Sequence, residues 1–322
     1  MKYFGSVRFF KNLILLCVVV CIAIPTALAI SKHCGLGTAR EQVSKLEAEL
    51  IQMRDRLDAL EQTETLPEKV PETTEPVEQE PEAGEQESFT AEVPEYQQLY
   101  PDFYAPEREV TEMIREDGVI YLTFDDGPTS NTDTVLRILE EKDVKATFFV
   151  TGPKSEESDQ RLRAIVEQGH TLGMHTYCHD YEIIYDSVEA YLEDMYQVFT
   201  MIREATGETP TVFRFAGGSI NAHNQGIHQE LMAEMLRRGF IPHDWNVSAQ
   251  DATAKTLSVD EVIRNVMGSA AGKQRGIVLL HDGGYQRTTA KALGTIIDRF
   301  LEQGFRFDRI QTDTKPVLFS YE

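Results

Sequence analysis

The feature that most constrains the fold is the alternation, between residues 99 and 322, of short apolar runs with longer segments of helical periodicity. Near-continuous apolar strands that alternate with helices are typical of a buried parallel sheet with right-handed crossovers. The sequence therefore predicts an α/β fold, and about seven strands suit a distorted, closed or nearly closed (β/α) barrel. An open doubly wound sheet is the alternative. The apolar runs are residues 118–124, 145–152, 170–175, 211–216, 240–247, 276–281 and 305–310.

The segments that follow these runs carry helix signals. Glycine ends most of them, which is a common C-terminal signal. One of them opens with a capping box from Ser258 to Glu261, in which each residue's side chain can bond the other's backbone amide. The chain is 41% hydrophobic, enough to build a core. We expect helices within residues 132–143, 159–169, 187–207, 224–239, 258–272 and 288–304.

Residues 12–30 form an apolar stretch close to the ~20 residues that span a bilayer. Basic residues before such a stretch favour a cytoplasmic N-terminus, and here they are Lys2, Arg8 and Lys11. We therefore expect a cytoplasmic segment at 1–11, a single transmembrane anchor in the cell membrane at 12–30, and an extracellular remainder. A cleaved signal peptide and a secreted protein are the alternative, because residues 27–29 fit a small-residue cleavage site.

Residues 38–61 carry a heptad pattern and predict a coiled-coil stalk that could form a homodimer. A solvated amphipathic helix is the alternative, because the run is shorter than the three to four heptads of a firm assignment. Cys34, just before it, would cross-link a dimer or remain a free thiol. Cys17 and Cys21 lie in the apolar stretch, so no disulfide framework is indicated. The heptad positions are Val43, Leu46, Leu50, Met53, Leu57 and Leu60.

Residues 62–98 are rich in Glu, Pro and Thr and cannot bury enough surface to offset their ordering entropy. We expect a disordered, self-repelling acidic linker here, with the folded domain over residues 99–322. The formal net charge is −22, and half of it comes from the twelve Glu and one Lys between Glu61 and Glu95. So acidic a chain argues against nucleic acid and anionic lipid surfaces as partners.

Polar residues gather where the apolar runs end. In a β/α barrel the carboxyl ends of the strands meet on one face, where active sites lie. We therefore expect these side chains, far apart in sequence, to be neighbours in the fold. They are Asp125, Asp126, His175, His179, Arg214, Asp251 and His281.

The segment HTYCH, residues 175–179, contains two imidazoles that one helical turn would put on the same face. This spacing favours metal ligation, and two unrelated loop histidines are the alternative. Cys178 precedes His179 directly and would point elsewhere, so we interpret it as a packing residue. A divalent cation held by His175 and His179 needs one carboxylate to form a 2-His-1-carboxylate face with open positions.

Asp125 and Asp126, in TFDDGPTS, are adjacent carboxylates that repel each other when both are ionised. The pair becomes useful if one Asp ligates the cation and the other is a general base toward a water that the cation activates. Gly127 and Pro128 allow a sharp turn and fix it. A solvated Asp-Asp-Gly-Pro turn is the alternative.

Three more residues complete the candidate site. His281 follows a buried strand and suits a general acid for a leaving amine, because its pKa is tunable near neutrality. A hydrogen-bonded structural histidine is the alternative. Asp251 could orient His281 or cap a helix, and Arg214 could hold the free Asp ionised or form a surface ion pair.

Over residues 115–310, five motifs in order resemble those of the polysaccharide deacetylase family, which is carbohydrate esterase family 4 or the NodB-homology domain. TFDDGP resembles the first motif, which implies that Asp125 is the catalytic base and Asp126 a metal ligand. HTYCH resembles the second motif and implies that His175 and His179 are the other ligands.

The last three motifs have counterparts as well. RFAGGS resembles the third and implies that Arg214 positions the base and that the Gly217 amide helps to hold the oxyanion. WNVSAQDA resembles the fourth and implies that Asp251 tunes the catalytic histidine. LLHD resembles the fifth and implies that His281 is the general acid and that Leu279 lines the pocket for the acetyl methyl.

The resemblance implies a membrane-anchored or secreted bacterial hydrolase of carbon–nitrogen bonds other than peptide bonds. It would remove N-acetyl groups from sugars of an extracellular glycan, with peptidoglycan the leading substrate. Zinc is the implied cation, and cobalt or nickel could substitute. An O-acetyl esterase on xylan or a similar glycan is one alternative, since the same site cleaves esters. A catalytically silent, metal-dependent glycan-binding envelope protein is the other.

Four positions depart from the usual family motifs. Ala216 stands where Pro is usual, and Gly217 where an aromatic residue is frequent. Ser248 and Ala252 stand where Asp and Trp are frequent. These positions belong to the groove walls and the backbone turn, so they affect substrate fit and turnover more than the type of reaction.

Overall fold

The computed structural model describes residues 93–108, 112–152, 154–253 and 256–319. Within these residues, eight strands form one sheet, and each strand pairs in parallel with its neighbours. The strands are β1 (Val119–Asp125), β2 (Thr147–Thr151), β3 (Thr171–Thr176), β4 (Val212–Phe213), β5 (Ile241–Pro242), β6 (Val247–Ser248), β7 (Arg275–His281) and β8 (Arg306–Asp308).

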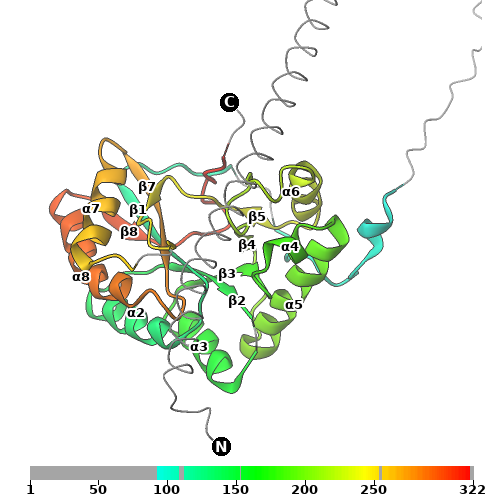
Figure 1. The fold of residues 1–322 in the computed structure, drawn as a ribbon, viewed down its shortest axis with the longest axis horizontal. Helices are drawn as coiled ribbons and strands as arrows, with labels where there is room; N and C mark the ends of the chain where they lie inside the picture. The colour runs from blue at the N-terminus through cyan, green and yellow to red at the C-terminus, as the bar shows by residue number, and fades with distance from the viewer. Residues whose placement is uncertain (1–92, 109–111, 153, 254–255, 320–322) are drawn as a thin grey trace, which may run out of the picture. The chain divides into compact units, whose positions relative to one another are not determined.

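The strand order is β5-β4-β3-β2-β1-β7-β6, and β8 also pairs with β1. β7 pairs with β1 from Val119 to Asp125, whereas β8 pairs with its first half and β2 with its second. In Figure 1 the strands occupy the middle of the domain and the helices surround them. Within the described residues no ladder joins β5 to β6, so the sheet is a curled and incompletely closed barrel. This agrees with the expected distorted β/α barrel.

One predicted strand was wrong in its extent. Residues 240–247 form two short strands, β5 and β6, which lie at opposite edges of the sheet. Arg214 explains the break, because the carbonyls of His243 (2.8 Å) and Asp244 (3.0 Å) accept hydrogen bonds from its guanidinium. These carbonyls turn toward a side chain, and the backbone leaves the sheet between the two strands.

All six predicted helices are confirmed, with ends within a few residues of those expected. The capping box from Ser258 to Glu261 is also confirmed at the start of α7. Thr129 and Ser155 cap two further helices in the same reciprocal way. The helices are α2 (Ser130–Glu141), α3 (Glu156–Glu167), α5 (Val188–Thr206), α6 (His228–Arg237), α7 (Val259–Ala270) and α8 (Arg287–Glu302).

Two short elements were not expected. A 3₁₀ helix, η1 (Glu95–Gln98), lies at the end of the stretch assigned to the linker. Buried Arg238 donates to the carbonyl of Leu99 at 2.8 Å, and Tyr96 packs against the core, so folded structure begins before residue 99. The four-residue helix α4 (Tyr181–Ile184) follows the HTYCH segment and is too short to show a helical period.

Side chains of the strands alternate between two cores, as they must on a pleated sheet. On β1, Ile120 and Leu122 belong to the large cluster between the sheet and the helices. Val119 and Tyr121 belong to a smaller cluster with Phe149 of β2, on the inner side of the curled sheet. Asp125 follows this inner row with the same two-residue period, which directs its side chain to the carboxyl end of the barrel interior.

The expected cytoplasmic segment (1–11), membrane anchor or signal peptide (12–30), coiled coil (38–61) and most of the linker (62–98) lie outside the described residues. Among the helices that the structure does describe, none has the length and apolarity needed to cross a bilayer. These predictions remain predictions from the sequence.

Candidate active site

Three candidate metal ligands converge at the carboxyl ends of β1 and β3. Asp126 follows the last residue of β1, His175 lies in β3, and His179 follows it in the next turn. Their ligand atoms all lie within 4.8 Å of one another. The Oδ1 atom of Asp126 is 3.6 Å from Nε2 of His175 and 3.2 Å from Nε2 of His179. The structure thus places the three residues named from the sequence around one point.

Two of these residues have an unusual backbone. Asp126 has φ of 70° and His179 has φ of 52°, both in the left-handed region that non-glycine residues seldom adopt. Such conformations cost free energy and persist where surrounding contacts enforce them, often at functional sites. Here the two conformations occur just after the ends of β1 and β3, where the side chains of Asp126 and His179 turn toward each other. The peptide bond between Gly127 and Pro128 is cis.

The charges of the cluster are mutually dependent. Burial opposes the ionisation of Asp126, but its interaction with His179 and the charges of His175 and His281 hold its pKa well below the usual range. The interaction with Asp126 raises the pKa of His179. Burial lowers the pKa of His175 and favours its neutral form, which is the form that ligates metals.

The residues fit a divalent cation. The Nδ1 atom of His175 lies 2.8 Å from the carbonyl oxygen of Arg214, which assigns the proton to Nδ1 and leaves a lone pair on Nε2. The Oδ1 atom of Asp126 is buried and lacks a well-aligned hydrogen bond although both imidazoles approach it. An ion among three such atoms would satisfy the carboxylate oxygen and use both lone pairs.

Asp125 is held by Arg214 and not by the imidazoles. Nη1 of Arg214 donates to Oδ1 of Asp125 at 2.8 Å and to Oγ1 of Thr123 at 2.7 Å. Its guanidinium carbon lies 4.3 Å from the ring centroid of Phe149, and the side chain has no solvent exposure. The alternative of a surface ion pair for Arg214 is therefore wrong. The other oxygen of Asp125 lies 3.9 Å from Nε2 of His175, beside the candidate metal site.

His281 lies beside Asp125, because the two residues are register partners in the parallel pair β1–β7. Nδ1 of His281 donates to Oδ1 of Asp251 at 2.8 Å, and the backbone amide of His281 donates to Oδ2 at 3.0 Å. Thr289 of α8 also donates to Oδ2, at 2.7 Å. Burial opposes protonation, but the hydrogen bond and charge of Asp251 outweigh it and raise the pKa of His281 to about 9. Asp251 thus orients His281, and it caps none of the helices that the structure describes.

Gly217 and Leu279 line the same end of the barrel. Leu279 precedes His281 by two residues, so both face the same side of β7, and Gly217 lies in the turn after β4 with φ of 77°. A Cβ atom at Gly217 would lie 3.0 Å from Cε1 of Tyr181. Among the described residues the Gly217 amide has no hydrogen-bond acceptor, which leaves it available to a substrate oxygen.

The structure shows the surroundings of the positions that depart from the family motifs. The carbonyl of Ala216 accepts hydrogen bonds from Tyr185 (2.7 Å) and Asn221 (3.0 Å), so side chains hold a turn that lacks proline. Ser248 is half-buried in β6, and Ala252 is exposed.

Sequence reasoning missed several residues that build the site. Thr289 and Thr123 carry no local signal, because a hydroxyl next to a distant carboxylate is visible only in the fold. Asp194 did have a signal: it falls on the apolar stripe of α5 formed by Tyr191, Met195 and Val198, where a charge is unexpected.

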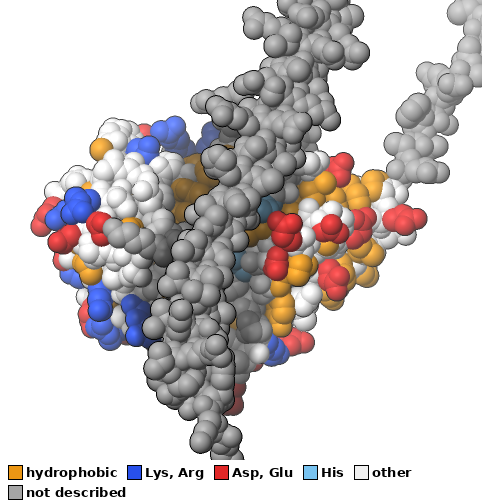
Figure 2. Space-filling view, in the orientation of Figure 1, with side chains coloured by type: hydrophobic (Ala, Val, Ile, Leu, Met, Phe, Trp, Pro, Cys, Tyr) orange, Lys and Arg blue, Asp and Glu red, His pale blue; other side chains and the backbone are white. Residues whose placement is uncertain are grey.

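The site is partly open to solvent, because the side chains of His179 and Asp126 are 34% and 27% exposed. Figure 2 shows histidine side chains reaching the surface between the half that carries α2, α7 and α8 and the half that carries α4, α5 and α6. Acidic and apolar side chains gather on the latter half.

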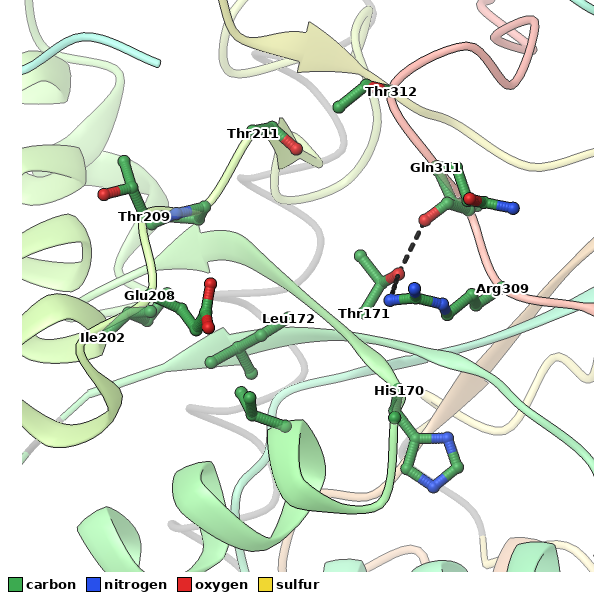
Figure 3. A pocket seen from close by; sticks show the side chains of 14 residues that line it. His170, Thr171, Leu172, Ile202, Glu208, Thr209, Thr211, Arg309, Gln311 and Thr312 are labelled. Carbon is green, nitrogen blue, oxygen red and sulfur yellow. Dashed lines mark hydrogen bonds between the residues drawn. The ribbon is translucent and has the colours of Figure 1, made fainter. Parts of the chain in front are cut away.

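A separate cavity of about 480 Å³ lies at the opposite ends of the strands. It is lined by Thr171 at the start of β3, by Thr211 just before β4 and by Arg309 just after β8. Figure 3 shows its side chains, with Arg309 directed toward Thr171. None of the residues named for catalysis lines it, so this cavity is separate from the candidate active site.

Known proteins are similar to this chain in sequence and in fold. The sequence profile described as polysaccharide deacetylase matches residues 113–236. A peptidoglycan-N-acetylglucosamine deacetylase of Bacillus cereus is 29% identical over 213 residues, 65% of this chain and 75% of that protein. The crystal structure of the catalytic domain of a peptidoglycan N-acetylglucosamine deacetylase from Eubacterium rectale has a TM-score of 0.62 and 31% identity, covering 66% of this chain and 97% of that one.

A second similar structure comes from a protein named for a different substrate. The Xyl-CE4 domain of a multidomain xylanase, from the hindgut metagenome of Trinervitermes trinervoides, has a TM-score of 0.52 and 29% identity. The match covers 61% of this chain and 88% of that domain.

A curled parallel barrel with a His-His-Asp cluster at its carboxyl edge, flanked by a buried Asp and an Asp-oriented histidine, defines a metal-dependent hydrolase. With the matched profile and the Eubacterium domain, the assignment becomes specific. The chain belongs to the polysaccharide deacetylase family.

Proposed function

We propose that this protein hydrolyses N-acetyl groups from N-acetylated sugars of an extracellular glycan, and that the glycan is peptidoglycan. The observation that carries the proposal is the juxtaposition of the His-His-Asp cluster with Asp125 and His281, which are register partners on adjacent strands. This arrangement supplies a candidate metal site, a base and an acid at one edge of the sheet. Two of the similar proteins are named as deacetylases of peptidoglycan N-acetylglucosamine, which supports the choice of substrate.

Asp126, His175 and His179 would hold the cation, and zinc suits a site of two imidazoles and one carboxylate, with cobalt or nickel able to replace it. When bound there, the cation would supply Lewis-acid chemistry, which polarises an acetamide carbonyl and makes water more acidic. Asp125 accepts the proton of the attacking water. Arg214 fixes the direction of that carboxylate through the 2.8 Å hydrogen bond.

His281 acts on the other side of the reacting amide. Because Nδ1 is bonded to Asp251, Nε2 is the nitrogen left to donate a proton to the departing amine. A pKa of about 9 keeps this histidine protonated at neutral pH. The Gly217 amide donates to the oxyanion, a contribution of about 3 kcal/mol for a well-placed donor. Leu279 lines the pocket for the acetyl methyl.

We also infer that the domain works outside the cell. Residues 12–30 have the length and apolarity of a membrane anchor, and both the anchor and the cleaved signal peptide lead to export. The heptad pattern of residues 38–61 supports a homodimeric stalk. An extracellular domain on an acidic linker would reach the cell wall.

The test is acetate release by the full-length chain, purified in detergent, from purified peptidoglycan and from chitooligosaccharides. We expect release with added zinc, loss of release with a chelator, and a mass decrease of one acetyl per modified sugar. Equal rates with zinc and with the chelator would overturn the metal-dependent mechanism.

A second candidate is an O-acetyl esterase on xylan, favoured by the similarity to the Xyl-CE4 domain of a xylanase. The same groups would act on an ester, whose alcohol leaves more easily than an amine. Acetylated xylan in the same assay separates the two, because the esterase would act on it faster than on peptidoglycan.

A further inference from the structure

The turn that presents His179 is held by a residue outside the recognised motifs. The backbone amides of Tyr177 and Cys178 both donate to the carboxylate of Asp194, at 2.7 Å and 2.8 Å. These are two of the three residues between the candidate ligands His175 and His179. Asp194 itself lies in α5, so its carboxylate connects that helix to the turn.

We propose that Asp194 is a positioning residue for the metal site, which fixes the backbone turn that carries His179. The inference rests on the metal site of the proposed function and not on the identity of the glycan. The carboxylate of Asp194 bonds backbone amides of the turn, so the residue acts through the backbone.

The setting of Asp194 favours this role over simple packing. Its side chain is only 5% exposed, and a buried carboxylate needs compensation for the water it has lost. Among the described residues no Lys or Arg forms an ion pair with it, so the two amides supply that compensation. Successive amides that point at one anion make charge-assisted hydrogen bonds, which are stronger than neutral ones.

The position of His179 in the turn depends on the Asp194 contact more than the position of His175 in β3 does. His175 is fixed by the β3 ladder and by its bond to the Arg214 carbonyl. His179 lies beyond the strand in a left-handed conformation, and its amide donates to Oγ1 of Thr176 at 2.9 Å. Without the Asp194 carboxylate, Tyr177 would keep only the bond from the Gly152 amide to its carbonyl (3.0 Å), and the Cys178 amide would lose its acceptor. The turn would then loosen just before His179 and let its imidazole leave the ligand position.

The decisive variant is Asp194→Asn, which keeps the size of the side chain but replaces one acceptor oxygen with a donor that faces an amide. Groups that orient metal ligands typically contribute 10- to 100-fold in metal affinity. We therefore expect the zinc Kd of the full-length chain to rise 10- to 100-fold, measured by competition with a chromophoric chelator. The absorption spectrum of the cobalt-loaded variant should also change, because the ligand geometry changes.

The matched control is Glu193→Gln, which removes the same charge from the adjacent, exposed position of α5 and should leave the zinc Kd unchanged. Asp126→Asn lacks one of the three candidate ligands, so zinc that this variant still binds measures binding elsewhere on the chain. Circular dichroism establishes which variants are folded. If Asp194→Asn does not fold, Asp194→Glu is measured in its place, since it retains two oxygens but shifts them along the side chain.

A zinc Kd within twofold of wild type in a folded Asp194 variant would overturn the inference, whatever its thermal stability. If the wild type itself binds no more zinc than Asp126→Asn, the metal site of the proposed function fails instead. Weak zinc binding and an altered cobalt spectrum in the Asp194 variant, with a normal Glu193 control, would support the inference.

Discussion

Arg214 and Asp125 form a buried ion pair of 2.8 Å inside the curled sheet, and the same guanidinium bonds the two carbonyls between β5 and β6. One side chain therefore both fixes the candidate base and fills the gap where the barrel lacks a closing ladder. The candidate base and the backbone between β5 and β6 therefore depend on the same side chain.

Replacement of Arg214 should destabilise the domain. Arg214→Gln leaves Asp125 buried without its partner and leaves the carbonyls of His243 and Asp244 with poorer donors. Removal of one member of a buried pair typically costs about 3–5 kcal/mol. We expect a loss of that size in the free energy of unfolding, measured with a denaturant in the presence of a chelator. A loss below about 1 kcal/mol would contradict the structural role given to Arg214.

Replacement of Asp125 should separate catalysis from metal binding. Asp125→Asn removes the proton acceptor but none of the three candidate ligands. We expect acetate release to fall by about 10²- to 10⁴-fold, the usual contribution of a general base, with a zinc Kd within a few-fold of wild type. Retained acetate release in this variant would contradict the role of Asp125 as the base. A preserved biological effect despite the loss of acetate release would favour the catalytically silent glycan-binding alternative.

Zinc should raise the thermal stability of the protein, because an ion that binds only the folded state stabilises it by mass action. At free zinc 100 times the Kd the gain is about 2.7 kcal/mol. Asp126→Asn removes the carboxylate between His175 and His179 and should abolish the zinc-dependent rise in Tm. Differential scanning calorimetry with and without zinc checks both statements; an equal rise in the variant would place the ion elsewhere.

The Asp251–His281 pair predicts a specific pH dependence of stability in the metal-free protein. The pKa of His281 is raised from an ordinary value of 6.5 to about 9, so the folded state binds this proton more tightly than the unfolded state. The resulting stabilisation is complete below pH 6.5 and is lost as the pH rises through 9. Asp251→Asn removes the main cause of the shift.

Denaturant unfolding of wild type and Asp251→Asn, with a chelator present, measures this dependence. The stability difference between them should shrink between pH 6.5 and 9. A difference that stays constant over this range would show that Asp251 does not hold a proton on His281. In the active enzyme, the alkaline limb of the rate profile should move to lower pH in the variant.

The turn at Gly217 should tolerate no side chain. Gly217 has φ of 77°, and an added Cβ would lie 3.0 Å from Tyr181 and 3.2 Å from Asn221. Gly217→Ala should move the free amide and lower kcat at least 10-fold, with little change in the zinc Kd. Gly226→Ala is the matched control, because its Cβ would meet nothing within 4 Å. Equal kcat values for the two variants would exclude the amide from the reaction.

Much of the fold was predictable because its signals are local. The helix from Val259 to Ala270 follows from a capping box and a period of apolar residues, all within one segment. The candidate ligands and the acid–base pair were found because each follows an apolar run, and parallel strands bring their carboxyl ends to one edge. The register of Asp125 opposite His281 is a consequence of that parallel pairing.

Other features depend on contacts between distant segments. Residues 240–247 have the composition of one strand, yet the guanidinium of Arg214 draws two of their carbonyls out of the sheet. In the sequence, Asp194 is an unexplained charge on the apolar face of a helix. Only the fold shows that two backbone amides donate to its carboxylate.

The amino-acid sequence by itself determined the strand–helix order and the residue types at the strand ends, because periodicity and turn chemistry act over a few residues. The tertiary structure alone decided the edge strands, the incomplete closure of the barrel and the partners that hold each functional group. Those outcomes depend on which buried donors and acceptors meet across tens to hundreds of residues, and the requirement that each find a partner is satisfied only in the folded chain.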